Sequence, residues 1–315
     1  MKHFTGRFFV VMFSVALALT FSGCGGGGGG TGAGISFKPA KSSSFDPITG
    51  TDASVAKPAK TSGEPDPRAE AAAASNVPLH WVYMVNDGEP VTANADGVSI
   101  RITFSPVEVV IDPADLKRRA NLSGPIHAEY NGVELSGNFG TQIEAGLATG
   151  AGMSYYRDET MDMSIELSSL TGTARMNLLA HGNYEPPFEW VPDKTNLDTF
   201  ETGHTWTVGS SMSGDVSISV TGGGNENINI PSTPYAEVWR LEEKIAAMTV
   251  RSKNYTNIVR LSRKTLITDL TGNPKAVTIE YWCAKGVGII KAVGLFQVLD
   301  KADVLYELMD TNLSQ

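Results

Sequence analysis

Histidine and carboxylate side chains are the first candidates for chemistry, because they bind metal ions and transfer protons near neutral pH. The histidines beyond the N-terminal segment are His80, His127, His181 and His204. No two of them stand four residues apart or in a His-x-His step, so no zinc motif is visible. The acidic residues Asp158, Glu159, Asp162 and Glu166 lack the alternating spacing and the turn glycine of a calcium loop. We therefore expect no metal and no cofactor.

Serine and glycine motifs that mark enzymes are also missing from the sequence. The serines between Gly209 and Gly214 are not in the Gly-x-Ser-x-Gly frame of a nucleophile turn. The Gly286-Val287-Gly288 step lacks the third glycine, the following helix and the ribose-binding acid of a dinucleotide site. We expect no catalytic residue and no enzyme activity. A hydrolase whose site is dispersed along the sequence stays as an alternative, because carboxylates that meet only in space leave no motif.

Cys24 is the residue whose surroundings predict a chemical modification. Lys2 and Arg7 precede an apolar run at residues 8–19, and the small residues Ser22 and Gly23 lead into the cysteine. A positive flank, a short apolar core and a small-residue exit are typical of a secretory signal peptide. The run is shorter than the roughly 20 apolar residues of a transmembrane helix.

Residues 19–24, Leu-Thr-Phe-Ser-Gly-Cys, resemble the bacterial lipoprotein lipobox. The resemblance implies that residues 1–23 are removed and that the thiol of Cys24 receives a diacylglyceryl group. By the same resemblance, Gly25, which is not aspartate, favours the outer membrane, facing the periplasm, as the destination. The expected membrane partner is therefore reached through a lipid anchor, which needs two or more acyl chains to be stable.

Charge and cysteine content limit the other partners. The formal net charge is -9, which argues against nucleic acid as a partner because nucleic-acid-binding proteins carry clustered Lys and Arg. Once Cys24 is acylated, Cys283 has no partner within the chain, so the fold cannot depend on a disulfide. We expect Cys283 to be a small buried side chain in an apolar strand.

The chain divides into three parts of different composition. Residues 1–23 form the signal peptide, and residues 24–77 are rich in Gly, Ser, Pro and Ala with few large apolar side chains. Such a segment cannot bury enough surface to offset its conformational entropy, so we expect a flexible linker. Residues 78–315 form a β-rich globular domain, with a subdivision near residue 200 as an option.

Strand-like runs dominate this globular part. About twelve short segments alternate apolar and polar residues or concentrate β-branched and aromatic ones, with turn residues between them. Asn131-Gly132 between two such runs predicts a hairpin with a type I′ turn. Pro106 within residues 98–111 predicts a bulge, a bend or an edge. Residues 235–250 fit either a helix or a strand, and their neighbours favour a strand. We expect an all-β or β-rich fold, a curved antiparallel sheet or open half-barrel.

Three segments are expected to depart from this strand pattern. Residues 112–120 predict one short helix, since Asp112 can cap it, Pro113 suits its first position and the basic residues near its end complement the dipole. The glycine-rich residues 137–152 predict a loop with one strand. Residues 181–194 are expected to be irregular, because Pro186, Pro187 and Pro192 interrupt them.

The C-terminal third has an order of features that resembles a known group of proteins. Its aromatic and strand-like segments are residues 205–207, 248–251, 254–260, 279–291 and 306–308. This order resembles uncharacterised bacterial envelope lipoproteins whose curved sheet is related to the lipoprotein-localisation half-barrels. In those chains an aromatic strand enters an Ala-Lys-Gly-Val-Gly turn and returns as a strand. Gly286 and Gly288 would permit the backbone angles of that return.

Aromatic residues at strand positions are the remaining candidates for a binding site. Those that could face an apolar ligand on the concave side of the sheet are Trp81, Trp206, Trp239, Tyr281 and Trp282. The competing interpretation, which we favour, places them in the core.

Together these features predict a lipid-anchored cell-envelope protein that binds a partner or has a structural role. A carrier of lipid or another apolar ligand on a half-barrel is one alternative. A module that binds another envelope protein is a second.

Overall fold

The structure, a computed structural model, describes most of the globular part of the chain. It describes residues 78–95, 98–112, 115–130, 132–148, 155–169, 172–189, 200–221, 224–268, 274–294 and 304–313. The predicted signal peptide, the lipidation site Cys24 and the linker to residue 77 lie outside the described residues.

Nearly all of the described chain is β-strand. A short 3-10 turn, η1 (Asn86–Gly88), follows the first strand. The strands are β1 (Leu79–Val85), β2 (Val91–Ala95), β3 (Val98–Ile102), β4 (Val107–Asp112), β5 (Lys117–Tyr130), β6 (Val133–Leu147), β7 (Tyr155–Ser169), β8 (Gly172–Glu189), β9 (Thr205–Val220), β10 (Asn225–Val250), β11 (Lys253–Thr268), β12 (Pro274–Ala284), β13 (Gly288–Val293) and β14 (Leu305–Thr311).

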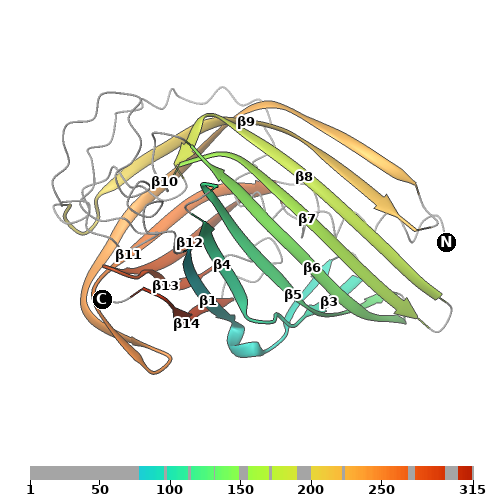
Figure 1. Ribbon diagram of the computed structural model, residues 1–315, viewed down its shortest axis with the longest axis horizontal. Coiled ribbons are helices and arrows are strands. Elements are labelled where there is room, and N and C mark those ends of the chain that lie inside the picture. The colour runs from blue at the N-terminus through green and yellow to red at the C-terminus, as the bar shows by residue number, and fades with distance from the viewer. Residues whose placement is uncertain are drawn as a thin grey trace.

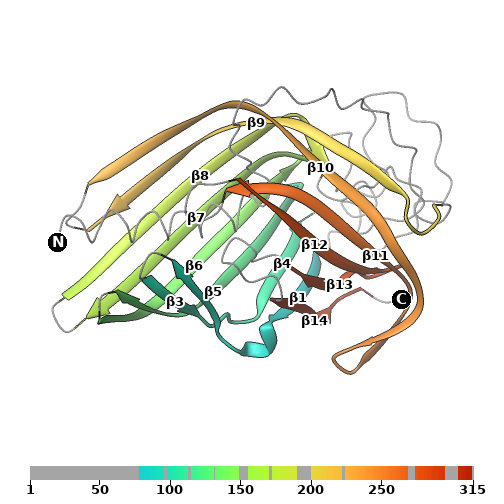
Figure 2. The same ribbon diagram turned by 180° about the vertical axis from the view of Figure 1, so that it is seen from behind.

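Twelve of these strands close into an antiparallel barrel. The hydrogen-bonded order is β5-β4-β1-β14-β13-β12-β11-β10-β9-β8-β7-β6, and β6 pairs back with β5. Figure 1 shows the long strands β5 to β8 lying side by side across one wall, and Figure 2 shows β10 to β13 on the other side. The predicted all-β fold is confirmed. The sheet is closed rather than the open half-barrel that was the narrower expectation, because β5 gives its second edge to β6.

Strands β2 and β3 extend the sheet at one end of the barrel. The first half of β5 pairs with β4, and its second half pairs with β3 along the same edge. The change of partner occurs after β3, where Pro106 precedes β4. Residues 98–111 therefore form two strands instead of one, and Pro106 lies in the break between them.

Alternation along the strands separates an apolar inner face from a polar outer face. On β7 the inward residues Met161, Met163 and Ile165 are at most 4% exposed, while Asp162 and Ser164 between them face outward. The same alternation appears on β5, where Ala120, Leu122, Ile126 and Ala128 are buried. The hydrophobic core thus lies inside the barrel.

The helix predicted at residues 112–120 is wrong. β4 ends at Asp112, and β5 begins at Lys117 after a turn in which the Lys117 N–H donates to Asp115 Oδ1 over 3.1 Å. Leu116 has φ 54°, which ends any helical path. Lys117 and Arg119 point outward and both pair with Glu144 of β6. Pairing with β4 and β6 overrides the local capping signals.

Two further segments are more regular than their composition predicts. β6 continues through the glycine-rich segment to Leu147, and β8 continues through Pro186 and Pro187 to Glu189. The prolines are tolerated because the pairing of β8 with β7 shifts register between Tyr156 and Asp158, so this part of β8 bulges away from the ladder. Residues 235–250 lie within strand β10, which is the interpretation that the neighbouring sequence favoured over a helix.

Candidate functional site

The described histidines are dispersed and their contacts are ordinary. His80 Nε2 lies 2.8 Å from Glu108 Oε1, and His181 Nδ1 lies 3.8 Å from Asp215 Oδ1, both at partly exposed positions. His204 stacks on Phe200 with the ring centroids 3.7 Å apart. Within the described ranges, no group of three His, Cys, Asp or Glu residues could hold a metal ion. No described helix is long and apolar enough to cross a membrane.

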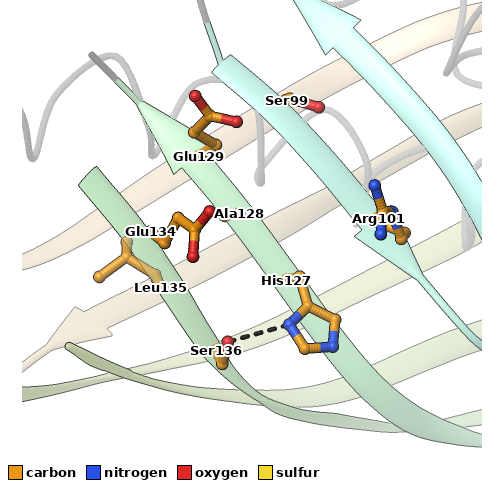
Figure 3. A pocket seen from close by; sticks show the side chains of 8 residues that line it. All are labelled: Ser99, Arg101, His127, Ala128, Glu129, Glu134, Leu135 and Ser136. Atoms are coloured by element: carbon orange, nitrogen blue, oxygen red, sulfur yellow. Dashed lines mark hydrogen bonds between the residues drawn. The ribbon is translucent and has the colours of Figure 1, made fainter. Parts of the chain in front are cut away.

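A pocket of about 190 Å³ lies on the outer face, where β3, β5 and β6 meet (Figure 3). Its lining is polar apart from Ala128 and Leu135. The pocket is smaller than most ligand sites, which have volumes of roughly 300–1,000 Å³. His127 Nδ1 lies 2.9 Å from Ser136 Oγ within it. The lining residues are Ser99, Arg101, His127, Ala128, Glu129, Glu134, Leu135 and Ser136.

The serine–histidine contact in this pocket follows from strand pairing. His127 and Ser136 are directly opposite each other on β5 and β6, which brings their side chains within hydrogen-bond reach. Glu129 and Glu134 form the next outward pair along the hairpin. In Figure 3 both glutamates lie away from the second ring nitrogen of His127, so neither orients the ring as a triad would. The geometry gives no sign of an activated nucleophile.

The inner wall carries an aromatic row across β9, β10 and β12. Trp206 and Trp239 are register partners, and their ring centroids are 6.4 Å apart with the planes nearly parallel. Trp239 and Tyr281 continue the row at 5.6 Å. Trp239 is 0% exposed and Tyr281 is 2% exposed. Three of the five aromatic residues predicted from the sequence are therefore brought together inside the barrel.

The other two predicted aromatic residues lie elsewhere. Trp81 on β1 is buried, and its indole N–H donates to the carbonyl oxygen of Val287 over 2.8 Å. Trp282 alternates with buried Tyr281 and lies on the outer face, between Arg260 at 6.0 Å and Lys291 at 5.2 Å from its ring centroid. Trp282 thus makes cation–π contacts outside the barrel.

A buried ion pair adjoins the aromatic row. Arg263 Nη1 lies 3.3 Å from Glu237 Oε1, and the two side chains are 2% and 0% exposed. The guanidinium carbon lies 5.9 Å from the Trp239 ring centroid and 5.8 Å from that of Tyr281. The two aromatic faces and the carboxylate together offset the cost of removing the arginine charge from water.

A second pair of charged residues enters the interior from the other wall. Ala145 of β6 is paired with both Arg118 of β5 and Glu159 of β7, so all three side chains share the inward face. The hydroxyl of Tyr184 on β8 donates to Glu159 Oε2 over 3.2 Å. Burial raises the pKa of the half-buried Glu159 to about 7, although Arg118, this hydrogen bond and Arg263 act to lower it.

Electrostatic coupling joins the two walls across the interior. The charge of Arg263 on β11 acts on Glu159 of β7, which is four strands away around the sheet. Arg118 acts likewise on Tyr281 of β12, whose pKa burial raises to about 12. Because these residues are several strands apart around the wall, the short path between each pair runs across the interior of the barrel. The set that we call the interior polar cluster is Arg118, Glu159, Tyr184, Glu237, Arg263 and Tyr281.

Two buried donors beside this cluster have no partner. Among the described residues, the indole N–H groups of Trp206 and Trp239 are enclosed and make no hydrogen bond. A buried donor without a partner costs about 1–3 kcal/mol, so native structures keep few of them. Such groups mark the places where a water molecule or a ligand atom completes the hydrogen bonding.

The sequence analysis missed the charged members of the cluster. Their signal is a charged residue at an inward position of an alternating strand. Glu159 stands two residues before Met161 and four before Met163, and Glu237 stands two before Trp239. Finding them needs the pairing register, which shows which positions face inward.

Comparison of the chain with protein-family models, with curated proteins and with solved structures gives no match. The resemblance of residues 205–308 to envelope lipoproteins therefore stays a prediction. What the protein does has to be argued from its own geometry.

Proposed function

We propose that the protein is a non-catalytic binding protein of the bacterial cell envelope, held by lipid on Cys24, whose barrel encloses an apolar ligand. The observation that carries the proposal is the closed barrel with an apolar inner face and a polar outer face. A protein that shields an apolar molecule from water needs this arrangement.

The number of strands supports an enclosed ligand. Barrel diameter grows with strand number, and about eight strands already give an interior that side chains can fill or that holds one small ligand. Twelve strands enclose a wider space than that. The inward residues Met161, Met163 and Leu178 make the inner wall apolar, and methionine side chains can repack around a ligand of that kind.

Attachment to the membrane is the second part of the proposal. The lipobox-like residues 19–24 and the low-complexity residues 24–77 would place the barrel beyond the bilayer surface on a tether. A tether of about 50 flexible residues has a root-mean-square span of about 40 Å. The barrel could then exchange its ligand with the membrane while staying bound to it.

A role as a docking module for another envelope protein has less support. Among the described residues, the large apolar side chains that are most exposed are Val133, Leu179 and Val238. They come from β6, β8 and β10, which are not neighbours in the sheet, so they do not indicate one contiguous patch. A hydrolase is the other candidate from the sequence, and the outer-face serine–histidine pair does not favour it.

The proposal is tested by extracting the purified full chain with organic solvent and identifying apolar molecules by mass spectrometry. We expect an apolar molecule at a stoichiometric ratio to the protein. Met163→Gln, which places a polar amide on the inner wall, should reduce its occupancy severalfold. Ser164→Gln, on the outer face of the same strand, should leave it unchanged.

Thermal unfolding curves show whether both variants fold. The proposal fails if the extract holds no such molecule and the stripped protein takes up no added fatty acid or fatty alcohol. Equal occupancy in the two folded variants would also contradict an interior site.

A further inference from the structure

The interior polar cluster sits in an otherwise apolar barrel, and its balance of hydrogen-bonding groups is uneven. Two guanidinium groups and two unpartnered indole N–H groups are donors that cannot accept. Glu237 is already within 3.3 Å of Arg263. The pKa of Glu159 is about 7, so its carboxyl is neutral in about half of the molecules near neutral pH. The cluster therefore presents an excess of donors and of positive charge.

Arg118 is the cation of this cluster that lies between the two walls. Its charge acts on Glu159 of β7, on Tyr281 of β12 and on Tyr83 of β1, which come from opposite sides of the barrel. Arg263, in contrast, is held by its ion pair and by two aromatic faces. We therefore take Arg118, which shares the inward face of β5 with Ala120, as the cation that a ligand can reach.

We propose that the enclosed ligand is amphipathic and carries an anionic head, a carboxylate or a phosphate. The head accepts hydrogen bonds from Arg118 and from the indole N–H groups of Trp206 and Trp239. The hydrocarbon chain lies along the apolar inner wall. This inference rests on the proposed function, because it specifies the ligand of the same interior.

The chemistry of the site favours an anion over the alternatives. A charge-assisted hydrogen bond to guanidinium is about twice as strong as a neutral one, and an acceptor-only head would supply the partner that both indoles lack. A cationic head would bring a third positive charge beside Arg118 and Arg263. A hydrocarbon without a head would leave the buried donors unsatisfied.

The test compares four ligands with the same hydrocarbon chain: palmitate, monohexadecyl phosphate, hexadecanol and hexadecylamine. Their affinities for the delipidated full chain are measured by quenching of tryptophan fluorescence and by calorimetry. We expect an anionic ligand to bind about tenfold more tightly than the alcohol, a difference of about 1.4 kcal/mol. The amine should bind more weakly than the alcohol. Palmitate and the phosphate differ in head geometry, so their ranking identifies the preferred anion.

Neighbouring residues on β5 provide a matched pair of variants. Arg118→Gln should abolish the preference for the anion while leaving the affinity for hexadecanol within about twofold. Arg119→Gln removes the adjacent arginine, which faces outward toward Glu144, and should keep the preference. Trp239→Phe keeps an aromatic side chain, although a smaller one, and removes the N–H, so it should lower the affinity for the anion more than the affinity for hexadecanol. If Arg118→Gln does not fold, Arg118→Lys retains the charge and should retain the preference.

The outcomes separate this inference from the proposed function. If none of the four ligands binds, the enclosed-ligand function fails. If all four bind equally well, or if Arg118→Gln and Arg119→Gln have the same effect, the barrel binds hydrocarbon without recognising a head, and the inference is overturned. Tighter binding of the amine would overturn it as well.

Discussion

Arg263 and Glu237 are nearly inaccessible to water, and each depends on the other for compensation. Removing a charge from water costs several kcal/mol, so a buried pair adds little stability as a pair and becomes costly when one partner is lost. Glu159 lowers the cost of burying a charge in a different way. It keeps its proton to a higher pH, because burial raises its pKa to about 7.

The first prediction concerns the buried ion pair. Arg263→Met leaves Glu237 buried without its partner, and we expect the free energy of unfolding to fall by about 3–5 kcal/mol. The double variant Arg263→Met/Glu237→Gln removes both charges and should recover most of that loss. Urea unfolding monitored by circular dichroism measures both. Equal losses in the single and double variants would show that packing, and not charge, sets the cost.

The second prediction concerns Glu159 and pH. Its pKa is raised in the folded state relative to the ordinary value of 4.5, so the folded protein retains a proton that the unfolded chain has released. The contribution of this group to the free energy of unfolding is fully present below about pH 4.5 and is lost as the pH rises through about 7. In Glu159→Gln this part of the decline should disappear. Unfolding curves of the ligand-free proteins from pH 4 to 8 test it, and parallel curves for the two proteins would contradict it.

At the scale of elements, the return from β12 to β13 shows how a turn is fixed from two sides. Gly286 has φ 88° and Gly288 has φ 94°, in the region that side chains disfavour. Two side chains of β1 then hold the turn in place. Trp81 donates to the carbonyl oxygen of Val287, and the Tyr83 hydroxyl donates to that of Ile289 over 2.9 Å.

The third prediction tests this turn. Gly286→Ala introduces a Cβ at a positive φ and should lower the free energy of unfolding by about 1–2 kcal/mol. Gly140→Ala on β6 is the control, since its added Cβ would meet only Ser164 Oγ at 3.8 Å, at an ordinary strand φ. Its effect should stay within about 0.5 kcal/mol. Urea unfolding of both variants measures the difference, and similar losses would contradict the backbone explanation.

At the scale of the whole molecule, the pairing of β5 with β6 decides whether an interior exists. Without it the sheet would be open, with unpaired backbone groups along two edges. Closure removes those edges and encloses the interior polar cluster. The proposed ligand binding and the proposed membrane attachment thus belong to different parts of the chain, the first to the barrel and the second to the N-terminal segment.

The fourth prediction concerns the anchor. Cys24→Ala removes the thiol that the lipobox-like sequence predicts as the acylation site, so the mature protein should lose its acyl chains. Mass spectrometry of the intact protein measures the change, and fractionation should move the protein out of the membrane pellet. Cys283→Ala is the control, because that buried thiol has no expected role in attachment. An unacylated wild-type protein that keeps residues 1–23 would contradict the anchor.

Local sequence patterns by themselves determined the β class, the hairpin and the turns. Tyr130 at the end of β5 lies opposite Val133 at the start of β6, where the sequence predicted a hairpin, and Gly286 and Gly288 bound the return to β13. These features depend on a few neighbouring residues. Their types show in the sequence which backbone angles they prefer and how apolar and polar residues alternate.

Only the tertiary structure decided the closure of the barrel and the composition of the interior polar cluster. Residues 112–120 carry good helix signals, yet pairing with strands on both sides outweighs them. Arg118 and Arg119 are adjacent in sequence, yet one faces the interior and the other faces Glu144. The physical reason is that strand register fixes which alternate positions face inward, and register is set by partners distant in the chain.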